Sequence, residues 1–166
     1  MTVDSTGALV FGMDKAGSSV TAKNFTAIVL GNDASELALS SSKTALNLTT
    51  GTGNDTVSLG SGKDSMVLGG GNDSINAGGG ADIVKLAAGF KGNATIDGGA
   101  GTDKLDLGTN AVKSVSVNST THEVTVTLAD GATMTVTNVE SFVYDTNGEA
   151  AGGIHTVGIA TLDKVF

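Results

Sequence analysis

The stretch GTGNDTVSLGSGKDSMVLGGGNDSINAGGGADIVKL, from Gly51 to Leu86, repeats one arrangement of glycine and aspartate four times at intervals of nine residues. The glycine pairs stand at positions 51/53, 60/62, 69/71 and 78/80, and the aspartates are Asp55, Asp64, Asp73 and Asp82. Neither the 3.6-residue period of a helix nor the two-residue period of a strand requires this spacing. Repetition at a fixed interval instead indicates a repeat architecture.

Apolar residues follow the same nine-residue interval well beyond the glycines. When the chain is written in rows of nine from Asn24, the seventh column is apolar in every row: Leu30, Leu39, Leu48, Val57, Met66, Ile75 and Val84. The ninth column is also apolar from Leu59 to Leu86. Residues two apart in a strand point to the same face. Each row therefore predicts a very short strand with two inward side chains, followed by a turn.

The glycines fit the turns, because they accept backbone angles that residues with a Cβ resist. One row makes half a coil, so two rows make a coil of 18 residues whose successive turns stack at the strand spacing of about 4.8 Å. Rows then alternate between two sheets. This arrangement predicts that Asp55 stacks on Asp73 along one edge, and that Asp64 stacks on Asp82 along the other.

Stacked carboxylates require a cation between them. At about 5 Å apart they repel by roughly 1 kcal/mol in bulk water, and by several times more at a partly buried turn. Glycine-rich turns also direct main-chain carbonyl oxygens toward the same position. Oxygen ligands without histidine or cysteine indicate a hard cation, and Ca²⁺ tolerates irregular oxygen sets better than Mg²⁺. The repeat therefore predicts calcium bound between coils.

The pattern changes at both ends of the repeat. Eighteen residues before Asp55 and Asp64 stand Leu37 and Leu46, and Ile28 occupies the same column one row earlier, so the coil is expected to continue there with apolar packing in place of metal. Residues 87–97 break the period. The segment GGAGTDKLDL from Gly98 restores it, shifted by three residues, and Asp82 and Asp103 are expected to frame a third site.

Lys91 stands eighteen residues after Asp73. Two interpretations remain open for it. Its ammonium could occupy the position of the next ion, or the side chain could simply be solvated.

The motif G-x-G-x-D-x-U-x, in four adjacent copies, resembles the hemolysin-type calcium-binding repeats of RTX proteins, with the similarity covering residues 50–106. NVESFVYDTNG (138–148) also resembles a segment that often follows such repeats. The resemblance implies an all-β fold, a right-handed parallel β-roll that is disordered without calcium. It also implies export by type I secretion through an uncleaved C-terminal signal, followed by folding in external calcium.

The resemblance further implies which residues hold calcium, with main-chain carbonyls joining both aspartates of a pair. One site would use Thr50, Thr52 and Asp55 with Gly69, Gly71 and Asp73. The other would use Leu59, Ser61 and Asp64 with Gly78, Gly80 and Asp82.

From Lys113 onward the period becomes two, as in strands, and Ala-Asp-Gly-Ala (129–132) predicts a hairpin turn. Val124, Val126 and Leu128 are expected to share one face. A solenoid must cover its open ends, so we expect an N-terminal cap at 1–23, a β-roll at 24–106 with RTX nonapeptides at 50–86 and 98–106, and a C-terminal cap of short antiparallel strands at 107–166. The tail LDKVF resembles an export signal, and equally a last core strand.

Composition narrows the class of protein. The 166 residues carry a net charge of −8, and all nine basic residues are lysine, which disfavours nucleic acid and anionic membranes as partners. There is no cysteine, no apolar run long enough to span a membrane and no recognisable cleavable leader. The glycine loops lack the context of a phosphate site.

Catalysis is not expected. The two histidines, His122 and His155, fit surface positions better than a metal or acid–base site. Alternating threonines at 125/127 and 135/137 fit an ice-binding face, although exposed threonine is ordinary in strands.

Two functions remain open. The chain could be the calcium-folded C-terminal module of a larger secreted or cell-surface bacterial protein, such as an adhesin. It could instead assemble with itself in the presence of calcium, as a surface-layer or biofilm-matrix protein. The absence of cysteine and arginine and the metal-free rows 24–50 fit a scaffold of this second kind.

Overall fold

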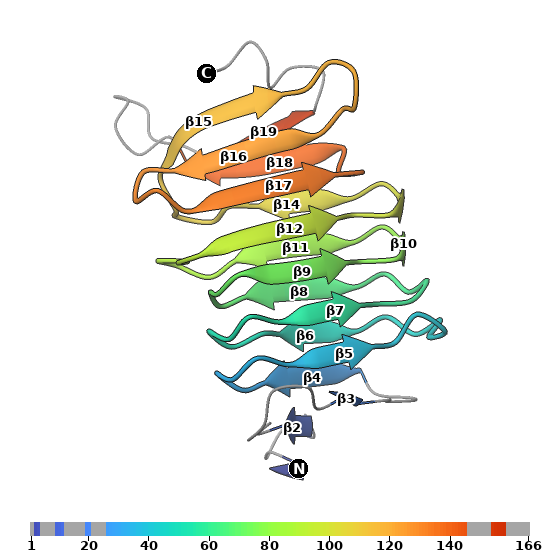
Figure 1. Cartoon of the computed structure of the whole chain (residues 1–166). Helices are drawn as coiled ribbons and strands as arrows, with labels where there is room; N and C mark the ends of the chain where they lie inside the picture. The colour runs from blue at the N-terminus through green and yellow to red at the C-terminus, as the bar shows by residue number, and fades with distance from the viewer. Residues whose placement is uncertain (1, 4–8, 12–18, 21–25, 146–153, 159–166) are drawn as a thin grey trace.

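The chain winds into a flattened coil whose two faces are parallel β-sheets (Figure 1). The computed structural model describes residues 2–3, 9–11, 19–20, 26–145 and 154–158, with side chains described over 26–144. Between Ala27 and Asp106, successive strands alternate between these two sheets, as the nine-residue rows predict, apart from two short strands at Gly79–Gly80 and Ala100–Gly101. The predicted all-β parallel roll is confirmed, and no helix occurs in the described ranges.

The strands divide as follows. The first sheet contains, in spatial order, β1 (Thr2–Val3), β2 (Leu9–Phe11), β4 (Ala27–Leu30), β6 (Asn47–Thr49), β8 (Ser65–Leu68), β11 (Ile83–Leu86), β14 (Lys104–Asp106), β18 (Ser141–Asp145) and β19 (Ile154–Gly158). The second sheet contains β15 (Val112–Val117), β16 (Val124–Leu128), β17 (Thr133–Thr137), β12 (Asn93–Asp97), β9 (Asp73–Asn76), β7 (Thr56–Ser58), β5 (Glu36–Ala38) and β3 (Ser19–Val20). A small third sheet pairs β10 (Gly79–Gly80) with β13 (Ala100–Gly101).

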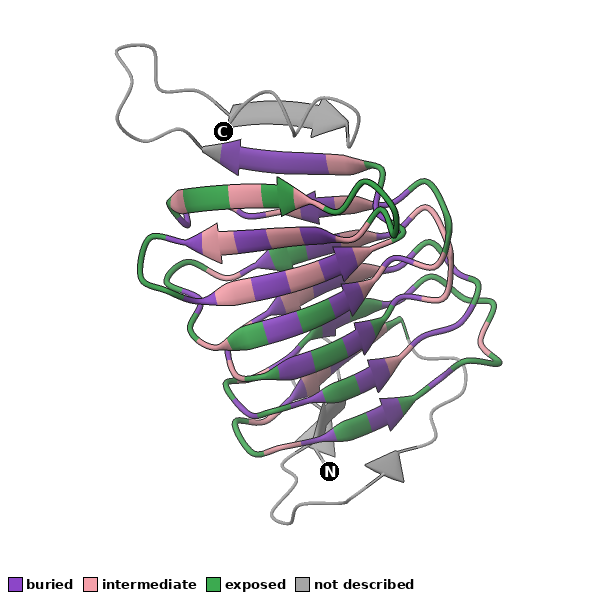
Figure 2. Cartoon of the chain, turned by 45° about the horizontal axis from the view of Figure 1, so that its top comes forward, coloured by how far each residue is buried: buried purple, intermediate pink, exposed green. Residues whose placement is uncertain are grey.

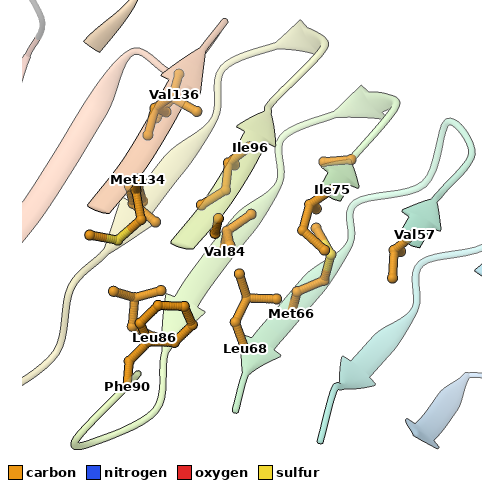
Figure 3. Packing of buried hydrophobic residues seen from close by; sticks show 14 of the residues in the cluster. Val57, Met66, Leu68, Ile75, Val84, Leu86, Phe90, Ile96, Met134 and Val136 are labelled. Atoms are coloured by element: carbon orange, nitrogen blue, oxygen red, sulfur yellow. The ribbon is translucent and has the colours of Figure 1, made fainter. Parts of the chain in front are cut away.

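One apolar core lies between the two sheets. Inward side chains stack in register from coil to coil, so that Leu48 pairs with Met66 and Met66 with Val84. Along most strands between Ala27 and Thr137, buried residues alternate with more exposed ones, whereas Phe142, Val143 and Tyr144 of β18 are buried in succession (Figure 2). In the close view, Val57, Ile75 and Ile96 of the second sheet lie beside Met66 and Val84 of the first (Figure 3). Burial of each such side chain contributes about 1.5–3 kcal/mol, so the core adds to the stability of the roll independently of any metal.

The 18-residue coil holds only in the middle of the roll. Ser65 lies over Asn47 and Ile83 over Ser65, as predicted. The first coil is longer, because residues 39–46 form a wider turn without glycine, and Leu37 therefore pairs with Val57. The prediction that Leu37 lies beneath Asp55 is wrong, and Ser35 occupies that position. Leu46 does lie beneath Asp64.

The break in the period after Leu86 is a longer turn at residues 87–92. The three extra residues make a 21-residue coil, so Lys104 lies over Ile83, as the predicted shift requires. Phe90 fills the turn with a fully buried ring, and its N–H donates to Asn110 Oδ1 at 3.1 Å.

Lys91 does not take the place of an ion. Ala94 lies over Asp73, while the Lys91 ammonium pairs with the Asp130 carboxylate at the surface and its side chain is 74% exposed. The ion-replacing interpretation of Lys91 is therefore wrong, and the largely solvated side chain has an ion-pair partner, Asp130, that the sequence did not indicate.

An antiparallel hairpin separates the last two coils. β15 and β16 extend the second sheet, and the predicted turn at 129–132 leads into β17, which returns to parallel pairing with β12. Val124, Val126 and Leu128 share the buried face, as predicted. His122 lies exposed in the hairpin loop with φ 58°. The division into caps at 1–23 and 107–166 stays a prediction, and the tail LDKVF lies outside the described residues.

Candidate metal centre

The turns between the two sheets form two edges of the roll. The first edge contains the turns that lead from the first sheet to the second, including those before β7 and β9, and it carries Asp55 and Asp73. The second edge contains the return turns, and it carries Asp64, Asp82 and Asp103. The predicted stacking of Asp55 on Asp73 and of Asp64 on Asp82 is confirmed by the strand registers.

Each carboxylate on the second edge accepts a hydrogen bond from the coil beneath it. Asp64 Oδ1 accepts from the Leu46 N–H at 2.8 Å, Asp82 Oδ1 from the Asp64 N–H at 2.7 Å, and Asp103 Oδ1 from the Asp82 N–H at 2.8 Å. The series continues one step past the aspartates, because Glu140 Oε2 accepts from the Asp103 N–H at 2.7 Å. We call this series the second-edge ladder.

The first-edge ladder is shorter. Asp55 Oδ1 accepts from the Ser35 N–H, and Asp73 Oδ1 from the Asp55 N–H, both at 2.9 Å. Above Asp73 lies Ala94, which has no carboxylate. The first edge therefore offers one pair of carboxylates.

The second oxygen of most ladder carboxylates has no hydrogen-bond partner. All five aspartates are at most 3% exposed, and the Oδ2 atoms of Asp55, Asp73, Asp82 and Asp103 are buried without a donor. A buried charged oxygen without a partner costs several kcal/mol unless it is neutralised or binds a cation. Four such atoms on stacked turns therefore point to cation binding.

Burial raises the pKa of all five aspartates above the usual value for a carboxyl group. At Asp73, burial raises the pKa to about 6, while the hydrogen bond from the Asp55 N–H lowers it and the Asp55 charge raises it. For Asp82 and Asp103, the charge of the neighbouring ladder carboxylates adds to the effect of burial.

These raised pKa values predict how the calcium-free protein responds to pH. The folded form holds protons that the unfolded form releases, so folding is most favourable below the unfolded pKa and loses stability as pH rises through the folded pKa. For Asp73 alone, whose pKa rises from 3.8 to about 6, the change is on the order of 1–3 kcal/mol. Without calcium, circular dichroism should therefore show more strand at pH 5.5 than at pH 7.5.

Both pH values lie above the sequence pI of about 4.4, which avoids isoelectric aggregation. Saturating calcium should reverse the trend, because protons compete with the ion for the same oxygens. Equal or greater strand content at pH 7.5 without calcium would contradict this account of the aspartates.

Glycine is required where successive turns touch. Gly80 has φ 144°, and a Cβ built on it would lie 2.0 Å from the carbonyl oxygen of Gly62 and 3.1 Å from Asp82 Oδ1. The position that a side chain would fill is thus faced by a main-chain oxygen and a carboxylate oxygen, both of which Ca²⁺ accepts as ligands.

Comparison with protein families agrees with this geometry. Residues 49–84 and 91–111 match the family model described as RTX calcium-binding nonapeptide repeat (4 copies). This chain carries RTX repeats. The match is to a calcium-binding structural repeat rather than to a family of enzymes, and a comparison with curated proteins returned no match.

The RTX repeats bind calcium, and the donor set in this chain fits that ion. Within the described ranges, no group of three or more His, Cys, Asp or Glu side chains could hold a metal by itself. An ion between two aspartates therefore requires main-chain oxygens as well, as RTX turns supply.

The individual ligand sets stay a prediction. The structure places Thr50, Thr52, Gly69 and Gly71 in the two stacked turns of the first edge that contain Asp55 and Asp73. It places Leu59, Ser61, Gly78 and Gly80 in the corresponding turns of the second edge, with Asp64 and Asp82.

Two features of the RTX edges were missed in the sequence. Glu140 belongs to the second-edge ladder. The sequence feature that could have indicated this is its place directly before the strand-like segment SFVY, as each aspartate of that ladder directly precedes a strand. On the first edge, asparagine side chains link successive turns, since Asn54 Oδ1 accepts from the Asn72 N–H and Asn72 Oδ1 from the Asn93 N–H. The repeated triplet GND, at 53–55 and 71–73, could have indicated these asparagine links.

Proposed function

We propose that this β-roll is the calcium-binding module of a secreted or cell-surface bacterial protein, and that it folds on binding calcium after export. The observation that carries the proposal is the row of buried, unpaired Oδ2 atoms on stacked RTX turns. Without an ion these atoms oppose folding. With one they stabilise it, because binding to the folded state alone adds its free energy to stability.

Folding that depends on calcium would suit a protein that is exported unfolded. Low calcium inside a cell would leave the chain unfolded and able to pass a type I secretion channel, and higher calcium outside would fold it. RTX repeats are typical of secreted proteins. The structure contributes one observation on membranes: among the residues that it describes, no helix has the length and hydropathy needed to cross one.

Ion selectivity tests the proposal directly. Isothermal titration should show at least two calcium ions bound per chain, one for each edge, and a tenfold excess of magnesium should not displace them. The reason is that Mg²⁺ demands a compact octahedron and dehydrates reluctantly, whereas Ca²⁺ accepts six to eight irregular oxygens. Equal affinity for the two ions, or no heat of calcium binding, would contradict a calcium module.

A second candidate is calcium-dependent self-assembly in a surface layer or biofilm matrix. The supporting observation is β15, which ends the second sheet and has a strand partner on only one side within the described residues. An open strand edge is a template for pairing with another chain. Light scattering of the calcium-loaded protein separates the candidates, because only the second predicts growth of oligomers on addition of calcium.

A further inference from the structure

The second-edge ladder extends beyond the RTX repeats into the segment between β17 and β18. β18 lies parallel to β14 with Ser141 beside Lys104 and Phe142 beside Leu105. Glu140 therefore precedes its strand as Asp103 precedes β14. The two residues are 37 positions apart in the sequence, because the β15–β16 hairpin intervenes.

Glu140 also makes the hydrogen bond that defines the ladder. Its Oε2 accepts from the Asp103 N–H at 2.7 Å, as Asp103 Oδ1 accepts from the Asp82 N–H at 2.8 Å. On the first edge the corresponding position is Ala94. The last step of the second edge thus presents a carboxylate where the first edge has none.

At Gly98, in the same turn as Asp103, a main-chain oxygen and a carboxylate oxygen face one position. A Cβ built on Gly98 would lie 2.1 Å from the carbonyl oxygen of Asn138 and 3.0 Å from Asp103 Oδ2. Asp103 Oδ2 is buried without a hydrogen-bond partner, and Asp103 itself is only 2% exposed. The arrangement matches that at Gly80, where a main-chain oxygen and a carboxylate oxygen also face the position of the absent side chain.

The Asn138 carbonyl is held in place by its own residue. Asn138 has φ 52°, which is unusual for a residue other than glycine, and its side-chain amide donates to Asp97 Oδ1 at 2.7 Å. The charges of Asp82, Glu140 and Asp97 all act on Asp103. Asp82 and Asp103 are buried, Asp97 is partly buried and Glu140 is exposed. Carboxylates this close to one another repel unless a cation is present.

We propose that Asp103 and Glu140, together with the main-chain oxygen of Asn138, bind an additional divalent cation of the calcium class. This inference rests on the proposed function, because it extends the chemistry of the repeat aspartates to a residue outside the repeats. The consequence is that the last coil, β17–β18, is attached to the roll by a metal ion. Docking of the C-terminal strands then depends on calcium as the repeats do.

The test is a count of bound calcium in Glu140→Gln. Glutamine keeps an oxygen that accepts from the Asp103 N–H and removes only the charge. We expect equilibrium dialysis with metal analysis to show one calcium ion fewer per chain than in the wild type. Glu123→Gln, the same change in the β15–β16 loop, is the matched control and should leave the count unchanged.

Amide hydrogen exchange shows which strands lose protection when the ion beside Glu140 is lost. In saturating calcium, the amides of β14 and β18 should exchange at least tenfold faster in Glu140→Gln than in the wild type, while those of β8 and β9 stay protected. Glu140→Asp keeps the carboxylate and should retain the ion with weaker affinity. Equal counts in Glu140→Gln and the wild type, or in Glu140→Gln and Glu140→Asp, would overturn the additional site. A wild type that binds no calcium would instead overturn the proposed function itself.

Discussion

Removal of calcium at pH 7.5 is expected to change the far-ultraviolet circular dichroism spectrum of the protein from that of a strand-rich fold to that of a largely unfolded chain. Three aspartate pairs, at 55/73, 64/82 and 82/103, are stacked in the roll. At a hundredfold excess over the dissociation constant, one ion stabilises the folded state by about 2.7 kcal/mol, so three ions contribute about 8 kcal/mol. That sum is comparable to the whole stability of an ordinary domain.

The calcium-free roll also carries specific costs. Four carboxylate oxygens are buried without partners, and the chain has a net charge of −8. The measurement is a calcium titration of chelator-treated protein, and strand signal should return cooperatively. Magnesium at equal concentration serves as the control and should not restore the signal.

The opposite result would reassign the role of calcium. β4 to β6 stack without ladder aspartates, and Ile28, Leu48 and Met66 form a continuous apolar column there. If these coils and the β15–β17 strands hold the fold alone, the calcium-free protein will already show full strand content. Calcium would then be a local clip or a trigger of assembly, which favours the self-assembling candidate.

The middle of the roll could be predicted from the sequence because one local pattern, the repeated glycines and aspartate, sets both the length of each coil and the position of the carboxylates that face the metal. Between Leu46 and Leu86, glycine sets the turn length and aspartate follows it, so every residue returns to its column after 18 positions. Period-two alternation similarly identified the buried face of β16.

Elsewhere the register between stacked strands depends on turn lengths that no local sequence pattern predicts. Two extra residues in the turn 39–46 moved Leu37 away from Asp55, and the longer turn around buried Phe90 brought Ala94, not Lys91, over Asp73. Glu140 joins Asp103 only because the β15–β16 hairpin folds outside the coil. Such contacts follow from tertiary packing across long sequence separations.

The second large effect is expected from Asp82→Asn, because Asp82 belongs to two stacked pairs. Its Oδ1 accepts from the Asp64 N–H, its own N–H donates to Asp103, and its Oδ2 is buried and unpaired. Asparagine keeps an acceptor for the Asp64 N–H and removes the charge. Loss of two ions should lower the free energy of unfolding in saturating calcium by about 5 kcal/mol, measured by denaturant titration.

Comparison with Asp73→Asn separates metal binding from packing. Asp73 is just as buried but belongs to one pair, since Ala94 lies above it, so its loss should cost about half as much. Asp106→Asn is the surface control, because Asp106 pairs with Lys85 outside the ladder, and it should change stability by less than about 1 kcal/mol.

In chelator, the difference between Asp82→Asn and the wild type should shrink or reverse sign, because the substitution also removes a buried charge that opposes folding. A loss of equal size with and without calcium would mean that Asp82 acts through its hydrogen bonds alone, and the second-edge ladder would then be a structural device rather than a calcium site.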